Sequence, residues 1–193
     1  MTRIVVIDPQ PAVRAGLTVL LRAEPGLVPV GAAGDAHEGA ELVERQRPGV
    51  VLLDPDGDGL ALCRSLRALA DPPRVVLYAA GGDPTLPVTA RVAGADGLVD
   101  KAAEPEELFE AIRVVSRGGS ALPPLDRAQL DGAAHRVDPQ DLALLAMLVD
   151  RTPPSDVADT LHLDRRRLGR RIEALLGRLR GRSTPASPRP RAV

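Results

Sequence analysis

The chain has 193 residues and a mass of 20.3 kDa, which leaves room for one medium-sized domain or two small ones. Its balance of 44% hydrophobic and 26% charged residues is that of a globular protein and excludes collagen-like and wholly disordered chains. No apolar run approaches the roughly 18 to 20 residues of a membrane helix, and Asp8 interrupts the first run before a signal-peptide core could form. We therefore expect a cytoplasmic protein without membrane contact.

The sequence offers little material for metal clusters or base stacking. Cys63 is the single cysteine, and the three histidines are scattered, so structural zinc is not expected. Tyr78 and Phe109 are the only aromatic residues. The core must therefore be built from Leu, Val, Ile and Ala, and RRM-like RNA binding is disfavoured because it needs an aromatic platform.

The net charge of −1 conceals an uneven distribution of charge along the chain. Residues 1–121 carry 12 basic and 17 acidic residues, whereas residues 122–193 carry 13 and 9. The surplus of positive charge is strongest in residues 164–193, where ten arginines face only Asp164 and Glu173. The two halves are therefore expected to have different partners, and the last part is suited to a polyanion.

Short apolar runs alternate five times with amphipathic stretches in the first part of the chain. The apolar runs are residues 3–8, 27–33, 50–54, 74–79 and 97–99, and the amphipathic stretches are residues 12–23, 37–46, 59–70, 84–93 and 106–117. Near-continuous Val, Leu, Ile and Ala indicate strands that are buried on both faces. Five such units predict an α/β fold, a doubly wound, flavodoxin-like parallel sheet covered by helices on both sides.

The rest of the chain predicts a small, wholly helical domain after a linker. Residues 122–136 contain little apolar patterning and are assigned to the linker that follows a domain of residues 1–121. Three helices are then expected within residues 137–180: one from Asp138-Pro139 to Val149, one from Pro153-Pro154 to Leu161, and one that Asp164 caps. Residues 181–193 are predicted to be a disordered basic tail.

Four chemically active side chains stand where the predicted strands end. These residues are Asp8, Asp54, Tyr78 and Lys101, the only lysine. Ligands of open parallel sheets bind beyond the carboxyl ends of the strands, and a 2-1-3-4-5 strand order would bring the four residues together. Two carboxylates and an ammonium could hold a divalent cation and a phosphoryl group, with Asp54 as the nucleophile. Alternatively, each Asp merely begins a turn.

The run from Asp54 to Gly59 permits two further interpretations. As a calcium loop it has acids at positions one, three and five and Gly at six, but Ser65 stands where a bidentate Glu is required. As the nucleophile loop of haloacid-dehalogenase-like phosphotransferases it follows an apolar strand, but Asp58 replaces the usual Thr or Val. Both interpretations are disfavoured.

The third helix of the second part has a buried and a basic side. Leu168, Ile172, Leu175, Leu176 and Leu179 share one face. At about 100° per residue, Arg166 and Arg170 lie opposite this stripe, and Arg167 and Arg171 lie on its flank. A short helix and a tight turn at His162-Leu163 precede it, as in a helix-turn-helix whose second helix enters the major groove. The alternative is a solvated basic face on a helical hairpin.

Taken together, these motifs resemble a response regulator of the LuxR/NarL type over about residues 3–179. The segments "RIVVIDPQPAVRAGLTVLLRAEPGLVPVGAAGDAHEGAELVERQRPGVVLLD" and "GADGLVDKAAEPEELFEAIRVVSRGG" are similar to the receiver domain, and "VDPQDLALLAMLVDRTPPSDVADTLHLDRRRLGRRIEALLGRL" to the DNA-binding domain. The resemblance implies that Asp54 is at the phosphoacceptor position, that Lys101 is the family's lysine, and that double-stranded DNA is the partner.

The sequence departs from the family where phosphorylation takes place. Relatives have two adjacent acids after the first strand, but here the second is Pro9, so we expect Asp8 and Asp54 to bind Mg²⁺ only weakly. The loop after Asp54 is about three residues shorter than in relatives, which displaces a carbonyl that helps to bind the metal. Tyr78 stands at the switch Ser/Thr position and is too large for the usual hydroxyl movement. The receiver is therefore interpreted as atypical and requires no cofactor.

The C-terminal part departs from the family as well. Relatives continue into a fourth helix used for dimerisation, whereas this chain continues "RGRSTPASPRPRAV", so the sequence leaves monomer and homodimer both open. His162 stands at a usual glycine in the turn. Arg165, Arg166, Arg167, Arg170 and Arg171 are the predicted DNA contacts.

The leading hypothesis is a non-enzymatic transcription regulator whose receiver is controlled by a small ligand or a protein partner rather than by ordinary phosphotransfer. A conventional regulator phosphorylated on Asp54 by a histidine kinase is the alternative. An aspartyl-phosphate phosphotransferase and a pure protein-interaction module are more distant alternatives.

Overall fold

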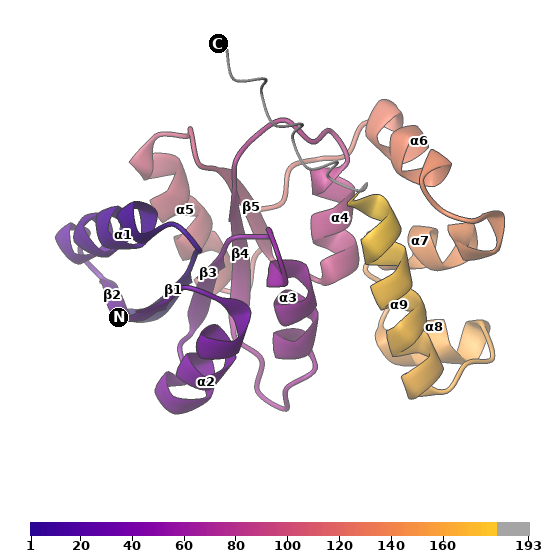
Figure 1. The fold of residues 1–193 in the computed structure, drawn as a ribbon, viewed down its shortest axis with the longest axis horizontal. Coiled ribbons are helices and arrows are strands. Elements are labelled where there is room, and N and C mark those ends of the chain that lie inside the picture. The colour runs from indigo at the N-terminus through magenta and orange to yellow at the C-terminus, as the bar shows by residue number, and fades with distance from the viewer. Residues whose placement is uncertain (181–193) are drawn as a thin grey trace, which may run out of the picture.

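The computed structural model describes residues 1–180 and consists of a parallel α/β sheet domain followed by a cluster of helices (Figure 1). The predicted disordered tail, residues 181–193, lies outside the described residues. None of the helices within residues 1–180 combines the length and the apolar character that a membrane crossing requires.

Five strands form one parallel sheet in the order β2-β1-β3-β4-β5, as predicted. The strands are β1 (Thr2–Ile7), β2 (Leu27–Ala33), β3 (Val50–Leu53), β4 (Arg74–Ala79) and β5 (Gly97–Asp100). All four residues of β3 are buried, which explains why this strand shows no alternation of apolar and polar residues. Pro29, which lacks an N–H group, lies in the edge strand β2 next to a register shift, where an unpaired position is tolerated.

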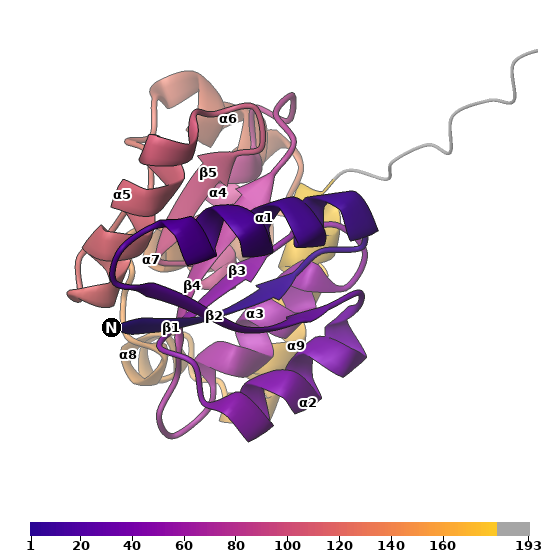
Figure 2. The ribbon, with the colours of Figure 1, turned by 90° about the vertical axis from the view of Figure 1, so that its left-hand side faces the viewer.

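Helices cover both faces of the sheet (Figures 1 and 2). They are α1 (Pro11–Ala23), α2 (Ala36–Gln46), α3 (Gly59–Arg67), α4 (Leu86–Ala93) and α5 (Pro105–Ser116). Buried residues of α1 and α5, such as Leu21 and Ile112, form one core layer, while those of α2, α3 and α4 form the other. The doubly wound architecture predicted from five alternating units is confirmed.

The second part consists entirely of helices. These are α6 (Arg127–His135), a short 3₁₀ helix η1 (Pro139–Asp141), α7 (Leu142–Val149), α8 (Pro154–Thr160) and α9 (Arg165–Leu179). The three predicted helices correspond to η1 with α7, to α8 and to α9. The Asp164 side chain caps α9 by accepting from the Arg167 N–H at 2.7 Å, as predicted.

Helix α6 lies within residues 122–136, where the sequence predicts only a linker. Asp126 accepts from the Gln129 N–H at 2.7 Å, and the Gln129 side chain accepts from the Asp126 N–H at 3.0 Å. This reciprocal capping box begins a helix whose only buried residue is Ala133. Its weak apolar pattern explains why the helix was missed.

The helical domain packs against α4 of the sheet domain through α6, α7 and α9 (Figure 1). Val88 of α4 and Leu144 and Leu175 of the helical domain are all fully buried and belong to one continuous core cluster. In the described structure, the two domains therefore share apolar core in addition to their covalent connection.

Candidate functional site

Two buried carboxylates lie side by side at the carboxyl end of the sheet. Asp8 follows β1 and Asp54 follows β3, the two central neighbours, and the Asp54 N–H donates to the Ile7 carbonyl at 2.8 Å. Asp8 is 2% exposed and Asp54 is 6% exposed. Each carboxylate accepts one local N–H: Asp8 from Gln10 at 2.8 Å and Asp54 from Asp56 at 2.7 Å. The predicted strand order brings them to one site.

Lys101, which follows β5, places its ammonium between these two carboxylates. Nζ donates to Asp8 Oδ2 at 2.6 Å and to Asp54 Oδ2. Burial opposes the charge on Lys101, but the hydrogen bonds and charges of Asp54 and Asp8 outweigh it and raise its pKa. The ammonium therefore stays charged and supplies the positive charge that the carboxylate pair requires.

The loop after Asp54 is tight and permits no side chain where α3 begins. A Cβ atom at Gly59 would lie only 2.0 Å from the carbonyl oxygen of Asp54, so glycine is required there. Gly57 adopts a left-handed conformation with φ of 58°. The Asp56 carbonyl accepts from the Gly59 N–H at 3.0 Å, and this hydrogen bond forms a turn between Asp54 and the start of α3.

These residues do not fit a tight magnesium site. Mg²⁺ prefers octahedral oxygen coordination that is anchored by carboxylates. Here Pro9 follows Asp8 and contributes no carboxylate, and the two available carboxylates already bind Lys101. Within residues 1–180, no group of three or more His, Cys, Asp or Glu is arranged to hold a metal ion.

Tyr78, at the end of β4, lies over Lys101 and completes the group of four predicted pocket residues. Its hydroxyl donates to the Lys101 carbonyl at 3.4 Å, and Lys101 Nζ is 5.9 Å from the ring centroid. Burial raises the pKa of Tyr78, an effect that Lys101 partly offsets. The phenol thus bonds the main chain just after β5 and keeps its proton.

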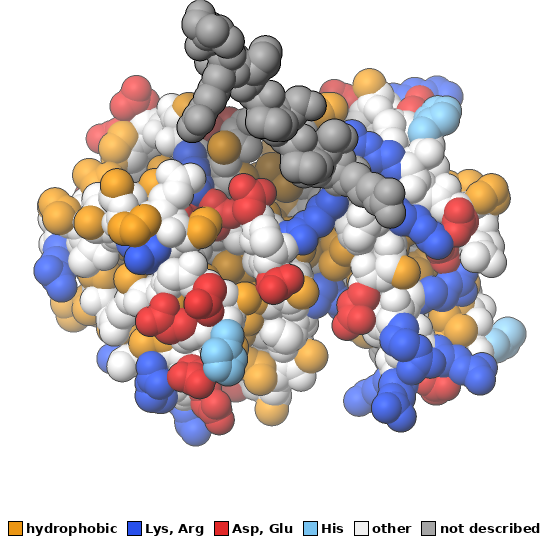
Figure 3. All heavy atoms as spheres, in the orientation of Figure 1, with side chains coloured by type: hydrophobic (Ala, Val, Ile, Leu, Met, Phe, Trp, Pro, Cys, Tyr) orange, Lys and Arg blue, Asp and Glu red, His pale blue; other side chains and the backbone are white. Residues whose placement is uncertain are grey.

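Helix α9 has the buried and basic sides that the sequence predicts. The leucine and isoleucine stripe is buried, with Leu175 and Leu179 fully inaccessible. Arg165, Arg166, Arg167 and Arg170 are exposed. Figure 3 shows Lys and Arg side chains gathered at the end of the helical domain where α9 begins. An exposed arginine cluster on one helix can contact a polyanion without rearrangement of the domain.

Arg171 differs from the other predicted DNA contacts. Its Nε donates to Asp141 Oδ1 at 2.7 Å, and Arg178 donates to the other oxygen of Asp141 at 2.7 Å. The Asp141 side chain is only 4% exposed. The Arg171 guanidinium is therefore engaged inside the helical domain, where it ties α9 to η1. No sequence pattern distinguishes Asp141 from the other acidic residues of this part of the chain.

Three arginines of the helical domain bind the sheet domain directly. Arg151 donates to the Ala95 carbonyl at 2.5 Å, and Arg136 donates to Thr85 Oγ1 at 2.7 Å. Arg180, which follows α9, donates to the carbonyls of Pro55 and Gly57 in the loop after Asp54. The end of α9 is thus connected to the loop that follows Asp54.

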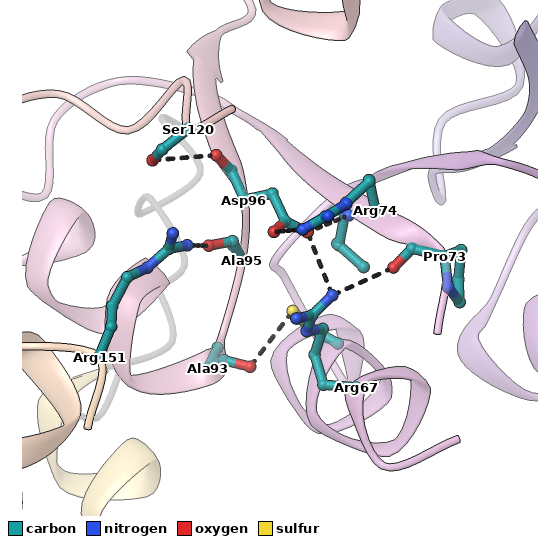
Figure 4. A network of polar contacts seen from close by, with 10 residues as sticks. Arg67, Pro73, Arg74, Ala93, Ala95, Asp96, Ser120 and Arg151 are labelled. Carbon is teal, nitrogen blue, oxygen red and sulfur yellow. Dashed lines mark hydrogen bonds and ion pairs between the residues drawn. The ribbon is translucent and has the colours of Figure 1, made fainter. Parts of the chain in front are cut away.

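Another buried carboxylate, that of Asp96, lies just before β5 and takes part in a network of polar contacts (Figure 4). Asp96 is 2% exposed and pairs with Arg67 at 3.4 Å and Arg74 at 3.1 Å. It also accepts from the Val75 N–H at 2.9 Å, so it joins β4 to the start of β5. Figure 4 shows Arg151 reaching Ala95, the neighbour of Asp96. We interpret this network as structural, because its charges are paired with one another.

Comparison with known proteins identifies the family. The family model described as "Response regulator receiver domain" matches residues 4–113, which is more than half of the chain. The chain belongs to the response regulator family. "DNA-binding transcriptional activator DevR/DosR" of Mycobacterium tuberculosis is 32% identical over 192 residues, covering 93% of this chain and 88% of that protein. "Nitrate/nitrite response regulator protein NarL" of Escherichia coli K12 is 29% identical, covering 83% of this chain and 81% of that protein.

Solved structures of response regulators have the same fold. A LuxR-family regulator from Aurantimonas sp. SI85-9A1 matches with a TM-score of 0.59 and 27% identity, covering 76% of this chain and 99% of that one. RcsB of Salmonella enterica, solved bound to a promoter with a phosphomimetic, matches with a TM-score of 0.60 over 92% of this chain and 91% of that one. At 16% identity, the match to RcsB shows the fold alone. It extends the fold resemblance beyond the receiver.

Proposed function

We propose that this chain is a DNA-binding transcription regulator that acts in the cytoplasm. Relatives with names of that kind cover nearly its whole length, and one of them is called a transcriptional activator. The proposal depends on the two sides of α9. This capped helix has exposed arginines opposite a buried apolar stripe, which is the arrangement that suits binding in the major groove. A solvated basic face is the competing interpretation. Homodimerisation on DNA remains part of the proposal.

In vitro selection from a random duplex library tests this function directly. We expect the full-length protein to enrich a defined motif, and the double variant Arg166→Ala/Arg170→Ala to lose that enrichment while it keeps its fold. Circular dichroism of both proteins provides the control for folding. Enrichment of no motif by a folded, full-length protein would overturn sequence-specific DNA binding.

We further propose that ordinary aspartyl phosphorylation does not control the receiver. Acyl-phosphate formation on Asp54 requires a cation to offset the phosphoryl charge, and the residue that follows Asp8 is Pro9. Lys101 binds the two available carboxylates, and the Tyr78 hydroxyl donates to the Lys101 carbonyl. A small ligand or a protein partner at the receiver would then supply the signal.

The conventional alternative is supported by the positions of Asp54 and Lys101, which the structure places in contact. Incubation with acetyl phosphate and Mg²⁺, followed by intact-mass measurement, separates the two proposals. We expect little or no mass increase corresponding to one phosphoryl group. Substantial labelling that disappears in Asp54→Asn would establish the conventional mechanism instead.

A further inference from the structure

Helix α9 carries an acidic residue among its arginines that has no partner in the described structure. Residues 164–180 contain two acids, Asp164 and Glu173. The Asp164 carboxylate caps the helix by accepting from the Arg167 N–H at 2.7 Å. Glu173 is exposed, and within residues 1–180 its carboxylate takes part in no hydrogen bond or ion pair. A carboxylate on a helix that contacts DNA is repelled by the phosphates, so its presence there requires a reason.

Glu173 lies on the same side of α9 as the two arginines that are predicted to contact bases. At about 100° per residue, Arg166, Arg170 and Glu173 fall within an arc of about 60° on the exposed face. Arg170 and Glu173 are separated by a rise of roughly 4.5 Å along the helix, which is comparable with the roughly 3.4 Å between successive base pairs. If α9 enters the major groove, these two side chains can therefore reach neighbouring base pairs.

The surface around Glu173 is open. Gly169 and Gly177 stand one turn before and one turn after it, and apart from the helix's own backbone no heavy atom lies within 4 Å of the position of a Cβ at either glycine. Ala174, the next residue, is exposed and adds only a methyl group. A duplex can therefore approach the Glu173 carboxylate closely, because its neighbours one turn away have no side chains.

A carboxylate in the major groove distinguishes bases by their donors and acceptors. Cytosine presents its N4 amino group there, and a carboxylate accepts a hydrogen bond from it. Guanine presents the two acceptors O6 and N7, which suit an arginine and leave a carboxylate without a donor. Thymine presents an acceptor and a methyl group. A glutamate beside arginines therefore favours a different base from the guanines that the arginines favour.

We propose that Glu173 is a specificity-determining residue that accepts a hydrogen bond from the N4 amino group of a cytosine, at a base pair adjacent to the one that Arg170 contacts. The inference rests on the proposed function, DNA binding by α9, and deepens it by assigning a base to a residue that phosphate attraction does not explain. At other bases the carboxylate is repelled by the phosphates without a compensating hydrogen bond, so it weakens binding to the wrong sequences.

The receiver offers a competing role for Glu173. Burial lowers the pKa of Arg64 on α3, and the charges of Cys63 and Glu173 partly offset this effect. Glu173 therefore also attracts a side chain of the sheet domain, although no ion pair joins it to Arg64. A glutamate that acted only through this attraction would influence the arrangement of the domains, and its loss would change binding to all sequences alike.

Selection from a random duplex library with the full-length protein tests the proposal. We expect the parent to enrich cytosine at one position and Glu173→Gln to enrich adenine there instead, because a glutamine side chain matches adenine N6 and N7. On duplexes that differ only at this base pair, the parent should prefer cytosine over adenine by roughly 5-fold or more, and the variant should lose or reverse this preference. The variant should also bind scrambled duplexes more tightly, since a repulsive charge is removed.

Two variants separate base recognition from indirect effects. Glu107→Gln neutralises an exposed acid on α5, and Arg64→Gln removes the receiver group that Glu173 attracts, so both should keep the cytosine. If Arg64→Gln changes the base preference as Glu173→Gln does, Glu173 acts through the receiver and the inference is wrong. The same motif from the parent and from Glu173→Gln overturns this inference alone. A folded parent protein that enriches no motif overturns the proposed function and the inference together.

Discussion

The ammonium of Lys101 binds Asp8 at 2.6 Å, and this bond joins the end of β5 to the end of β1 across the sheet. The same ammonium binds Asp54, so one cation serves both carboxylates. For a metal ion to bind Asp8 and Asp54, these carboxylates must exchange their bonds to Lys101 for bonds to the metal. The two carboxylates of this pocket therefore share one internal cation, and Pro9 adds no third carboxylate beside them.

Restoring the second acid should partly restore phosphorylation chemistry. In Pro9→Asp, a further carboxylate next to Asp8 raises affinity for a divalent cation that must compete with Lys101. We expect labelling by acetyl phosphate and Mg²⁺ to rise several-fold above the parent level, measured by intact mass. Pro9→Asn provides an uncharged control of similar size. Equal labelling of the Asp and Asn variants would show that charge at this position is not the limiting factor.

Arginines on different sides of α9 should affect DNA binding differently. Arg166→Ala or Arg170→Ala should each cost about 1 to 3 kcal/mol on the selected duplex and relax the preference at one base pair, because a guanidinium fork matches guanine in the major groove. Replacing Arg165 or Arg167 should weaken selected and scrambled duplexes alike and reduce the salt slope by about one.

Titrations at several salt concentrations, on both duplexes, measure these differences. The opposite pattern, with Arg167→Ala erasing the preference while Arg170→Ala weakens both duplexes equally, would mean that a different face of α9 contacts the bases.

Asp141 should matter for stability rather than for base contacts. Asp141→Ala removes the shared partner of Arg171 and Arg178 and leaves two adjacent guanidinium groups without it. We expect the free energy of unfolding to fall by about 1 to 3 kcal/mol, because the charged hydrogen bonds of a buried carboxylate are lost while the two partly exposed arginines stay accessible to water. Urea unfolding followed by circular dichroism measures this change. Arg170→Ala, at an exposed position of the same helix, is the control and should change stability by less than about 0.5 kcal/mol.

Cys63 should be unreactive in the folded protein. Burial, with a smaller contribution from Asp96, raises the pKa of its thiol to about 12. A thiol with a raised pKa keeps its proton in the folded state while the unfolded chain ionises near pH 9, so its contribution to stability is complete below pH 9 and is lost towards pH 12.

Reaction with Ellman's reagent at pH 8 should be more than about 100-fold slower in the native protein than in guanidinium chloride, since the thiolate is scarce and enclosed. The stability difference between the parent protein and Cys63→Ala should also shrink as the pH rises above 9. Rapid modification of the native thiol would show that α3 opens readily.

The sheet and its pocket follow from the sequence because their signals are local. Four strand-end residues and a strand order are enough to place Asp8, Asp54, Tyr78 and Lys101 together. The bond from Lys101 to both carboxylates depends on side-chain geometry, which no spacing rule predicts. Helix α6 was missed because it buries only Ala133 and its capping box lies in a stretch rich in Gly and Pro.

The contacts between the domains could not be predicted from the sequence. Arg136, Arg151 and Arg180 bind carbonyl and hydroxyl oxygens, and main-chain oxygens are present at every position in the chain. The sequence therefore shows that these residues are basic but does not show which oxygen atoms they bind. Arg171 illustrates the same limit, because its position on the flank of α9 suits either DNA or Asp141, and only the packing of η1 favours the carboxylate.

The position of Tyr78 has a practical spectroscopic consequence. The sequence contains one tyrosine and no tryptophan, so all of the protein's tyrosine emission originates within 5.9 Å of the Lys101 ammonium. Occupancy or rearrangement of the pocket alters the surroundings of this one phenol, and the unmodified protein therefore contains an intrinsic optical probe at its receiver site.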